Sequence, residues 1–224
     1  MLSAGDVESP AAAEALEKLC RAYWQPLYAF IRRSGHSPHD AQDLTQAFLL
    51  HLLEKKALRK VSPEKGRFRT FLLAALKYFL ANERERLQAQ KRGGNVTFVP
   101  LDAQLAEHQY AREAGNSTHP DQVFERRWAL TLLDKVLGTL EAEMTQAGKS
   151  DRWRELKLSL LSDSAAVPYA EIAARLGVTQ SGVKMAVMRL RQRFGELLRA
   201  EIAGTVGSPE EIEDEMRHLL SVIS

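Results

Sequence analysis

The chain has 224 residues, 45% of them hydrophobic, which is enough for one large or two small domains with buried cores. Its formal net charge of +2 identifies no partner, but the single cysteine, Cys20, excludes an intramolecular disulfide framework and favours a reducing compartment. The first ten residues do not resemble a signal peptide, and no apolar stretch approaches the roughly 18 residues that span a bilayer, so we expect a soluble, cytoplasmic protein with no membrane partner.

Charge is distributed unevenly along the chain. Residues 59–93 carry ten Lys and Arg against three Asp and Glu, and residues 169–199 carry six against two. Residues 201–224 reverse the balance, with six acidic side chains against Arg217 alone. Both basic segments are therefore candidates for holding phosphate groups, whereas the acidic tail is expected to avoid DNA.

Helical periodicity dominates the first half of the chain. Apolar residues recur every three or four positions over 11–33, where Pro26 is expected to kink or split the helix. Ser37 and Pro38 provide an N-cap and a first-turn proline for a second helix, which runs to about residue 56. A basic loop then leads into a third helix, predicted over about 68–90.

The second half is also helical, and strand-like alternation is nearly absent from the chain. Further helices are predicted over about 122–147, 152–161, 169–176 and 181–202, and Ser208 and Glu211 form a capping-box pattern that opens a last acidic helix. The stretch with the weakest periodicity precedes them and marks a linker. The sequence thus predicts an all-α chain with two small helical domains over 11–95 and 122–203, a linker over 96–121 and a C-terminal extension over 204–224.

The segment 169–183 has the spacing of a helix-turn-helix. Gly177 can adopt the left-handed conformation that ends the first helix, Val178 is expected to help close the core, and Thr179 or Ser181 can cap the second helix. The outer face of the second helix would offer a row of basic side chains to a DNA major groove and its phosphates. A solvated basic face on an ordinary helical bundle is the alternative.

Three motifs carry a resemblance to a known family. His39 to Phe48 is an acidic helix that ends in an aromatic residue, residues 66–86 alternate aromatic and basic side chains, and residues 177–191 follow the helix-turn-helix glycine. In this order and separation they resemble the extracytoplasmic-function group (group 4) of sigma-70-family sigma factors, which keep domains sigma-2 and sigma-4. The resemblance covers about residues 18–200 and implies core RNA polymerase and promoter DNA as partners.

In that family the acidic helix docks onto the coiled coil of the polymerase's largest subunit. The resemblance therefore implies that the polymerase-binding residues are Asp40, Asp43, Leu44, Gln46 and Phe48. An alternative is that the acids only stabilise the helix N-terminus, by about 0.3–1 kcal/mol each within the first turn. Asp43 lies beyond that turn, which favours the partner interpretation.

Ala47 stands where the family commonly has Glu, which leaves the docking helix one charge short. A phosphate on Thr45 would supply about −1.5 to −2 charges, so Thr45 is a candidate phosphosite and a protein kinase a candidate partner. The alternative is an ordinary helix threonine whose hydroxyl bonds to its own turn. An anti-sigma factor is a further partner that the resemblance allows.

The segment 66–86 is similar to the family's −10 recognition region, where opened DNA is held by cations that follow the backbone and aromatic rings that meet the bases. The implied −10 DNA-binding residues are Lys77, Tyr78, Asn82, Arg84, Arg86, Lys91 and Arg92. Phe68, Phe71 and Phe79 are expected in the core instead. Tyr78 and Asn82 replace the family's Asn and Asp, so detailed base contacts are not transferred.

The second helix of the helix-turn-helix resembles the family's −35 reading helix. The implied −35 DNA-binding residues are Gln180, Ser181, Lys184, Arg189, Arg191 and Arg193. Met185 and Ala186 replace the family's usual Ser-Arg, which predicts an altered or weaker −35 preference, although Ala186 is small enough to touch a thymine methyl.

An enzyme, a cofactor and a metal site are not expected, because the sequence has no phosphate-binding glycine loop, nucleophile elbow or Cys/His metal spacing. The expected function is that of a sigma factor, which binds core RNA polymerase, recognises −10 and −35 elements and promotes transcription initiation. A free-standing helix-turn-helix regulator that does not join the polymerase, or a helical interaction module without DNA, is the alternative. The acidic C-terminal helix either covers the DNA-reading surface or packs on the last domain.

Overall fold

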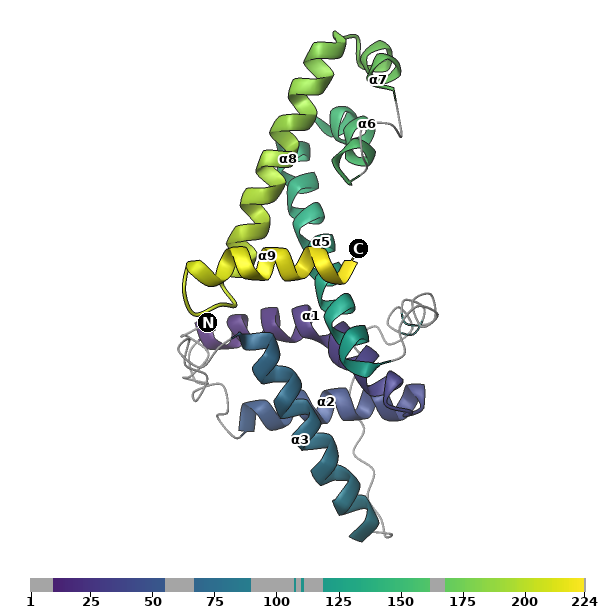
Figure 1. The fold of residues 1–224 in the computed structure, drawn as a ribbon, viewed down its shortest axis with the longest axis vertical. Coiled ribbons are helices and arrows are strands. Elements are labelled where there is room, and N and C mark those ends of the chain that lie inside the picture. Colours follow the sequence, from purple (N-terminus) through teal and green to yellow (C-terminus); the bar gives the residue numbers. More distant parts are fainter. Residues whose placement is uncertain are drawn as a thin grey trace. The chain divides into compact units, whose positions relative to one another are not determined.

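The computed structural model describes residues 10–54, 67–89, 107, 110, 119–161 and 168–223. All regular elements in these ranges are α-helices, as predicted (Figure 1). In chain order they are α1 (Pro10–Arg33), α2 (Pro38–Glu54), α3 (Phe68–Ala89), α5 (Pro120–Gln146), α6 (Ser150–Leu161), α7 (Tyr169–Leu176), α8 (Gln180–Ala203) and α9 (Glu210–Ile223).

These helices form two compact units. Unit 1 comprises the residues up to Thr131 together with those from Ile202 onward, and unit 2 comprises Leu132–Glu201. The long helices α5 and α8 therefore contribute residues to both units. The C-terminal helix α9 belongs to unit 1, although it is separated from α1, α2 and α3 in the sequence.

Unit 1 is built on α1, α2 and α3, with α1 packed on α2 and α2 packed on α3. Helix α1 is continuous across Pro26, so the predicted split does not occur. The hydroxyl of Ser37 accepts a hydrogen bond from the Asp40 backbone N–H at 3.1 Å, which confirms Ser37 as the cap of α2. Tyr28 and Leu72 are among the largest side chains that are fully buried in this unit.

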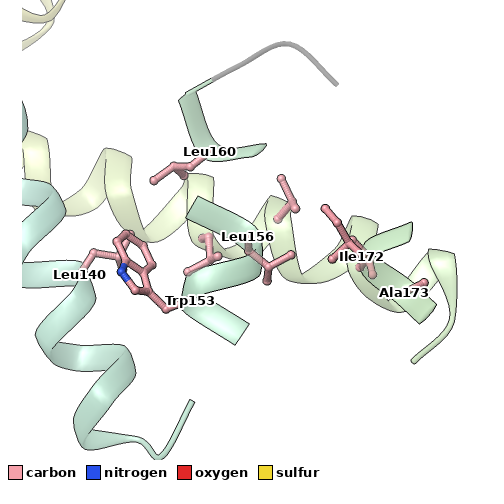
Figure 2. Packing of buried hydrophobic residues seen from close by; sticks show 9 residues of the cluster. Leu140, Trp153, Leu156, Leu160, Ile172 and Ala173 are labelled. Atoms are coloured by element: carbon pink, nitrogen blue, oxygen red, sulfur yellow. The ribbon is translucent and has the colours of Figure 1, made fainter. Parts of the chain in front are cut away.

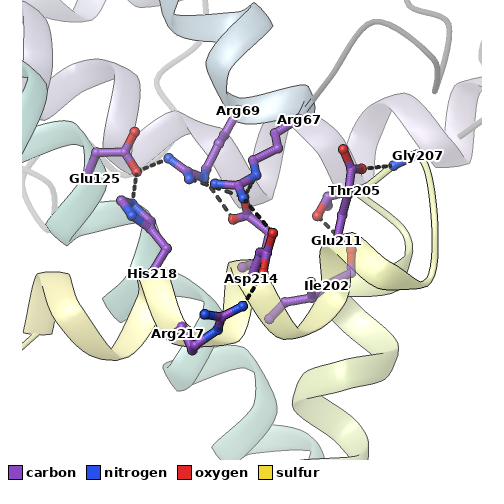
Figure 3. A network of polar contacts seen from close by, with 11 residues as sticks. Arg67, Arg69, Glu125, Ile202, Thr205, Gly207, Glu211, Asp214, Arg217 and His218 are labelled. Atoms are coloured by element: carbon purple, nitrogen blue, oxygen red, sulfur yellow. Dashed lines mark hydrogen bonds and ion pairs between the residues drawn. The ribbon is translucent and has the colours of Figure 1, made fainter.

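Helix α9 joins unit 1 through a buried network of charged side chains (Figure 3). Arg69 at the start of α3 donates from Nε and Nη2 to the carboxylate of Glu215 on α9, at 2.9 and 3.1 Å. The same guanidinium contacts Glu125 on α5 and lies 4.9 Å from the ring centroid of Trp128. Arg67 adds a 2.6 Å contact from its Nε to Glu215. One carboxylate on α9 therefore pairs with two arginines at the start of α3.

The turn that leads into α9 differs in one detail from the predicted capping box. The carboxylate of Glu211 accepts a hydrogen bond from the backbone N–H of Gly207 at 2.8 Å, and not from that of Ser208. A hydrogen bond from Ser208 lowers the pKa of the neighbouring Glu210 carboxyl, which favours its charged form at the positive end of the helix dipole.

Unit 2 is a small bundle with one apolar core that joins four helices (Figure 2). Leu140 comes from α5, Trp153 and Leu156 come from α6, Ile172 comes from α7, and Val183 begins the contribution of α8. These residues are at most 5% exposed. The core thereby fixes the orientation of α7 and α8, the two helices of the predicted helix-turn-helix.

The turn between α7 and α8 has the predicted chemistry with one exception. Gly177 has a φ of +64°, in the left-handed region, and the next N–H donates to the carbonyl of Ala173 at 3.0 Å. The hydroxyl of Thr179 accepts from the Gly182 N–H at 3.1 Å, so Thr179 caps α8 and Ser181 does not. Val178 is 36% exposed, and its expected place in the core is wrong.

Removal of the Glu215 carboxylate should destabilise unit 1. Glu215 is 1% exposed, so Glu215→Ala leaves Arg69 buried without its bidentate partner and should lower the free energy of unfolding by about 3–5 kcal/mol. The matched control, Glu85→Ala, removes an exposed carboxylate from α3 and should change it by no more than about 0.5 kcal/mol. Urea unfolding followed by circular dichroism measures both. Equal midpoints would show that the network does not stabilise the fold.

Candidate functional site

The acidic face of α2 lies at the surface of unit 1. Asp40 and Asp43 are both exposed. Asp40 accepts a hydrogen bond from the Ser37 hydroxyl at 2.7 Å, while Asp43 lies 3.2 Å from the ring Nδ1 of His39. Both carboxylates therefore remain available to a partner, and Asp40 also helps to cap its own helix. Leu44 and Gln46 are half-buried beside them.

Two of the predicted α2 residues lie in the core. Phe48 has no exposed surface and packs against Phe79 of α3, with 5.5 Å between the ring centroids. It supports the acidic face from beneath and cannot touch a partner directly. Thr45 is also fully buried, and its hydroxyl donates to the carbonyl of Ala41 at 2.6 Å. The prediction that Thr45 is a phosphosite is therefore wrong, because a kinase cannot reach this buried hydroxyl. The hydroxyl instead bonds to its own helical turn, as the alternative interpretation predicts.

The predicted −10 residues that are described lie on the outer side of α3. Tyr78 is 68% exposed, and Asn82 and Arg84 are exposed one turn later. Arg84 has no hydrogen-bond or salt-bridge partner within the described part of the chain. Lys77 lies 2.7 Å from the carboxylate of Asp121, at the start of α5. The side chain of Arg86 and the whole of Lys91 and Arg92 fall outside the described residues.

The aromatic residues at the start of α3 are largely buried. Phe68 is 3% exposed and meets Tyr23 of α1 edge-on, with 5.3 Å between the ring centroids. Phe79 is 6% exposed, and Phe71 is half-buried. The prediction that these three rings pack inward is therefore confirmed for Phe68 and Phe79, and Tyr78 is the ring that α3 offers to solvent.

A groove of about 1010 Å³ in unit 1 brings the two sets of predicted residues together. Asp40, Asp43 and Leu44 of α2 line it from one helix, and Lys77 and Arg84 of α3 line it from another. The remaining lining residues come from the end of α1, the α1–α2 turn and the same two helices, and are Phe30, Ser34, Gly35, His36, Ala47, Leu80, Ala81 and Glu83. The groove is thus lined by acidic side chains from α2, by basic side chains and Glu83 from α3, and by apolar side chains.

The turn beside this groove is held by Arg32 of α1. Its Nη1 donates to the carbonyl of His36 at 2.5 Å, and its Nε and Nη2 donate to the carboxylate of Glu107 at 2.9 and 2.7 Å. The hydroxyl of Tyr28 also donates to Glu107, at 2.5 Å, and burial together with this carboxylate raises the pKa of Tyr28. Glu107 belongs to the predicted linker, and sequence periodicity gave no sign of this contact.

Arg67 and Arg69 differ from the other cations of the −10-like segment. Glu215 pairs with both, and Arg69 is 5% exposed, so these two charges are directed into the protein. The sequence contained a signal for this arrangement, namely an acidic C-terminal helix in a chain with a basic segment over 59–93. What it did not contain was the identity of the paired residues.

On α8 the predicted −35 residues divide into two groups. Gln180, Ser181, Lys184 and Arg189 are exposed, and the described residues include no salt-bridge partner for Lys184 or Arg189. Arg191 is also exposed, but it donates from Nη2 to the Ser159 carbonyl at 2.8 Å. The outer face of α8 is therefore less cationic than the sequence count suggested.

Arg193 is directed toward its own unit. Its Nε and Nη2 donate to the carboxylate of Glu143 on α5 at 2.9 and 2.6 Å, and Nη1 lies 3.1 Å from Glu196. These contacts raise the pKa of Arg193, and the guanidinium lowers the pKa of Glu143. Since its charge is already balanced by two carboxylates, Arg193 is a weak phosphate ligand, and its predicted place in the DNA-binding set is not supported by this geometry.

No group of three or more His, Cys, Asp and Glu among the described residues is arranged to hold a metal ion. None of the described helices is both long and apolar enough to cross a membrane.

Comparison with known families gives a match to the first part of the chain. Residues 19–89 match the family Sigma-70 region 2. The match covers the last part of α1, all of α2 and α3 and the segment between these helices. Neither the curated proteins nor the solved structures include a match to the chain. All the residues that line the groove lie within the matched residues.

Substitutions on α2 should distinguish Phe48, a buried residue that supports the helix, from Asp43, an exposed residue that is available to a partner. Phe48→Ala removes a fully buried ring and should lower the free energy of unfolding by about 3–5 kcal/mol. Asp43→Asn changes an exposed side chain and should lower it by no more than about 0.5 kcal/mol. Both values come from urea unfolding of the purified chain. A Phe48→Ala variant as stable as the parent would contradict its placement in the core.

Proposed function

We propose that this chain is a sigma factor, a subunit that binds core RNA polymerase and directs it to promoters. What carries the proposal is the groove within the Sigma-70 region 2 domain, where exposed carboxylates of α2 share one surface hollow with the exposed cations of α3. Carboxylates suit a basic protein surface, and cations beside an exposed aromatic ring suit single-stranded DNA. One domain thereby offers a surface to each of two partners.

The proposal extends to the extracytoplasmic-function group and to a sigma-4-like role for unit 2. The α7–α8 pair has the tight glycine turn, the capped second helix and the exposed outer face that a helix-turn-helix requires. Lys184 and Arg189 would contact phosphates of a −35 element in duplex DNA. Such a protein works in the cytoplasm and needs no catalytic residue.

In this mechanism, the free energy gained from binding the opened DNA strand offsets the cost of separating the two strands. Unstacking a base costs a few kcal/mol, and contacts made only by the opened strand must offset that cost. Arg84 supplies a charge that follows the phosphates, and Tyr78 supplies an exposed ring for an unstacked base. Docking of α2 on the polymerase holds these groups at the site where the duplex opens.

Reconstitution with core RNA polymerase tests the proposal. The chain should co-purify with core enzyme and direct run-off transcription from a promoter, and Asp43→Asn should weaken its affinity for core enzyme about two- to fivefold, the range for loss of one exposed ion pair. Glu141→Gln, which removes an exposed carboxylate from α5, is the control and should bind as the parent does. A chain that binds promoter DNA but never core enzyme would be a free-standing regulator, and the proposal would be abandoned.

Tyr78 should contribute to strand opening through its ring and not through its hydroxyl. In the reconstituted complex, Tyr78→Ala should weaken capture of the opened strand by about 1–3 kcal/mol, whereas Tyr78→Phe should retain it. Permanganate reactivity of unpaired thymines reports the opened fraction. If both variants open the promoter as the parent does, Tyr78 does not hold a base.

A further inference from the structure

The outward face of α8 carries two exposed methionines. Met185 is 44% exposed and Met188 is 52% exposed, and they lie three residues apart on one side of the helix. The opposite side contains Val187 and Leu190, which are 2% and 7% exposed in the core of unit 2. The methionines therefore point away from the core, and packing within unit 2 does not account for them.

The surroundings of the methionines indicate the kind of partner. At 100° per residue, Ser181 and Gln192 continue the methionine stripe at its two ends, and Lys184 and Arg189 flank it on either side. Both cations are exposed and have no salt-bridge partner in the ranges that the structure covers. A narrow apolar stripe with basic margins complements a polyanion that presents apolar groups between its charges.

Duplex DNA has that arrangement in its major groove. Phosphates run along both margins, and the thymine C5-methyl is the apolar group on the base edges between them. The flexible thioether chain of methionine fits irregular apolar surfaces. Ala186, the residue that the sequence pointed to for such a contact, is half-buried and packs against the unit 2 core. The exposed Met185 and Met188 are therefore better placed than Ala186 to contact a thymine methyl.

We infer that Met185 and Met188 are specificity residues that contact thymine methyl groups in the major groove of duplex DNA, while Lys184 and Arg189 hold the phosphates on either side. This inference rests on the proposed DNA-binding function of unit 2 and deepens it, because it names the chemical group that α8 reads. Each contacted methyl should strengthen binding about fourfold, the effect of removing one such group from water.

The test compares thymine with uracil, which differs from it in lacking the C5-methyl. Duplexes that bind the full-length chain are first enriched from a randomised pool at low salt, and the enriched duplex is then made with either base. The uracil duplex should bind about fourfold more weakly for each contacted thymine. The double variant Met185→Ala/Met188→Ala should bind the two duplexes equally, and Met185→Leu/Met188→Leu should still distinguish them.

Leu220→Ala is the matched control, since Leu220 is a 55% exposed apolar residue on α9 of unit 1. It should distinguish thymine from uracil as the parent does. If the parent chain binds duplexes in a salt-dependent way but shows no preference for thymine, the inference is overturned. The same holds if the alanine double variant keeps the parent's preference. In either case the proposal that unit 2 binds DNA still stands. Absence of salt-dependent duplex binding by the parent chain overturns both.

Discussion

Burial of the Arg69 guanidinium is the interaction on which unit 1 depends. Moving a charged group out of water costs several kcal/mol, and it is tolerated only where every donor finds an acceptor. Glu215 takes two of the donors, Glu125 takes a third and Trp128 covers the face of the guanidinium. The three partners come from α5 and α9, so the start of α3 is fixed by segments far away in the sequence. Because the start of α3 is fixed, the positions of the cations further along this helix are fixed as well.

Ion pairing within each unit decides which cations can serve another partner. Arg67, Arg69 and Arg193 are paired with carboxylates inside their own units, whereas Arg84, Lys184 and Arg189 have no salt-bridge partner within the described ranges. A count of Lys and Arg along the sequence treats all six alike. Since a paired guanidinium has little left to offer a phosphate, the first group contributes less than the second to the field that nucleic acid meets.

Sequence reasoning found the features that are local and missed those that join distant segments. The helices follow from apolar periodicity, and the Gly177 turn and the Ser37 cap follow from the chemistry of one or two residues. The burial of Thr45 and the pairing of Arg193 depend on which helices pack side by side, which no single segment specifies. The acidic groups of α2 and the cations of α3 were identified separately. Their meeting in one groove depends on how α2 packs against α3.

That meeting has an electrostatic consequence under the proposed function. As long as Asp40 and Asp43 are uncompensated, they oppose the approach of phosphates to the groove that Lys77 and Arg84 also line. A basic surface docked on α2 would neutralise the two carboxylates and leave the cations of α3 to act alone. Binding of the protein partner would then favour binding of the DNA strand, and by linkage the strand would favour the protein partner equally. Under the proposed function, the isolated chain should hold DNA weakly, because the acidic side chains of α2 in its own groove are still uncompensated.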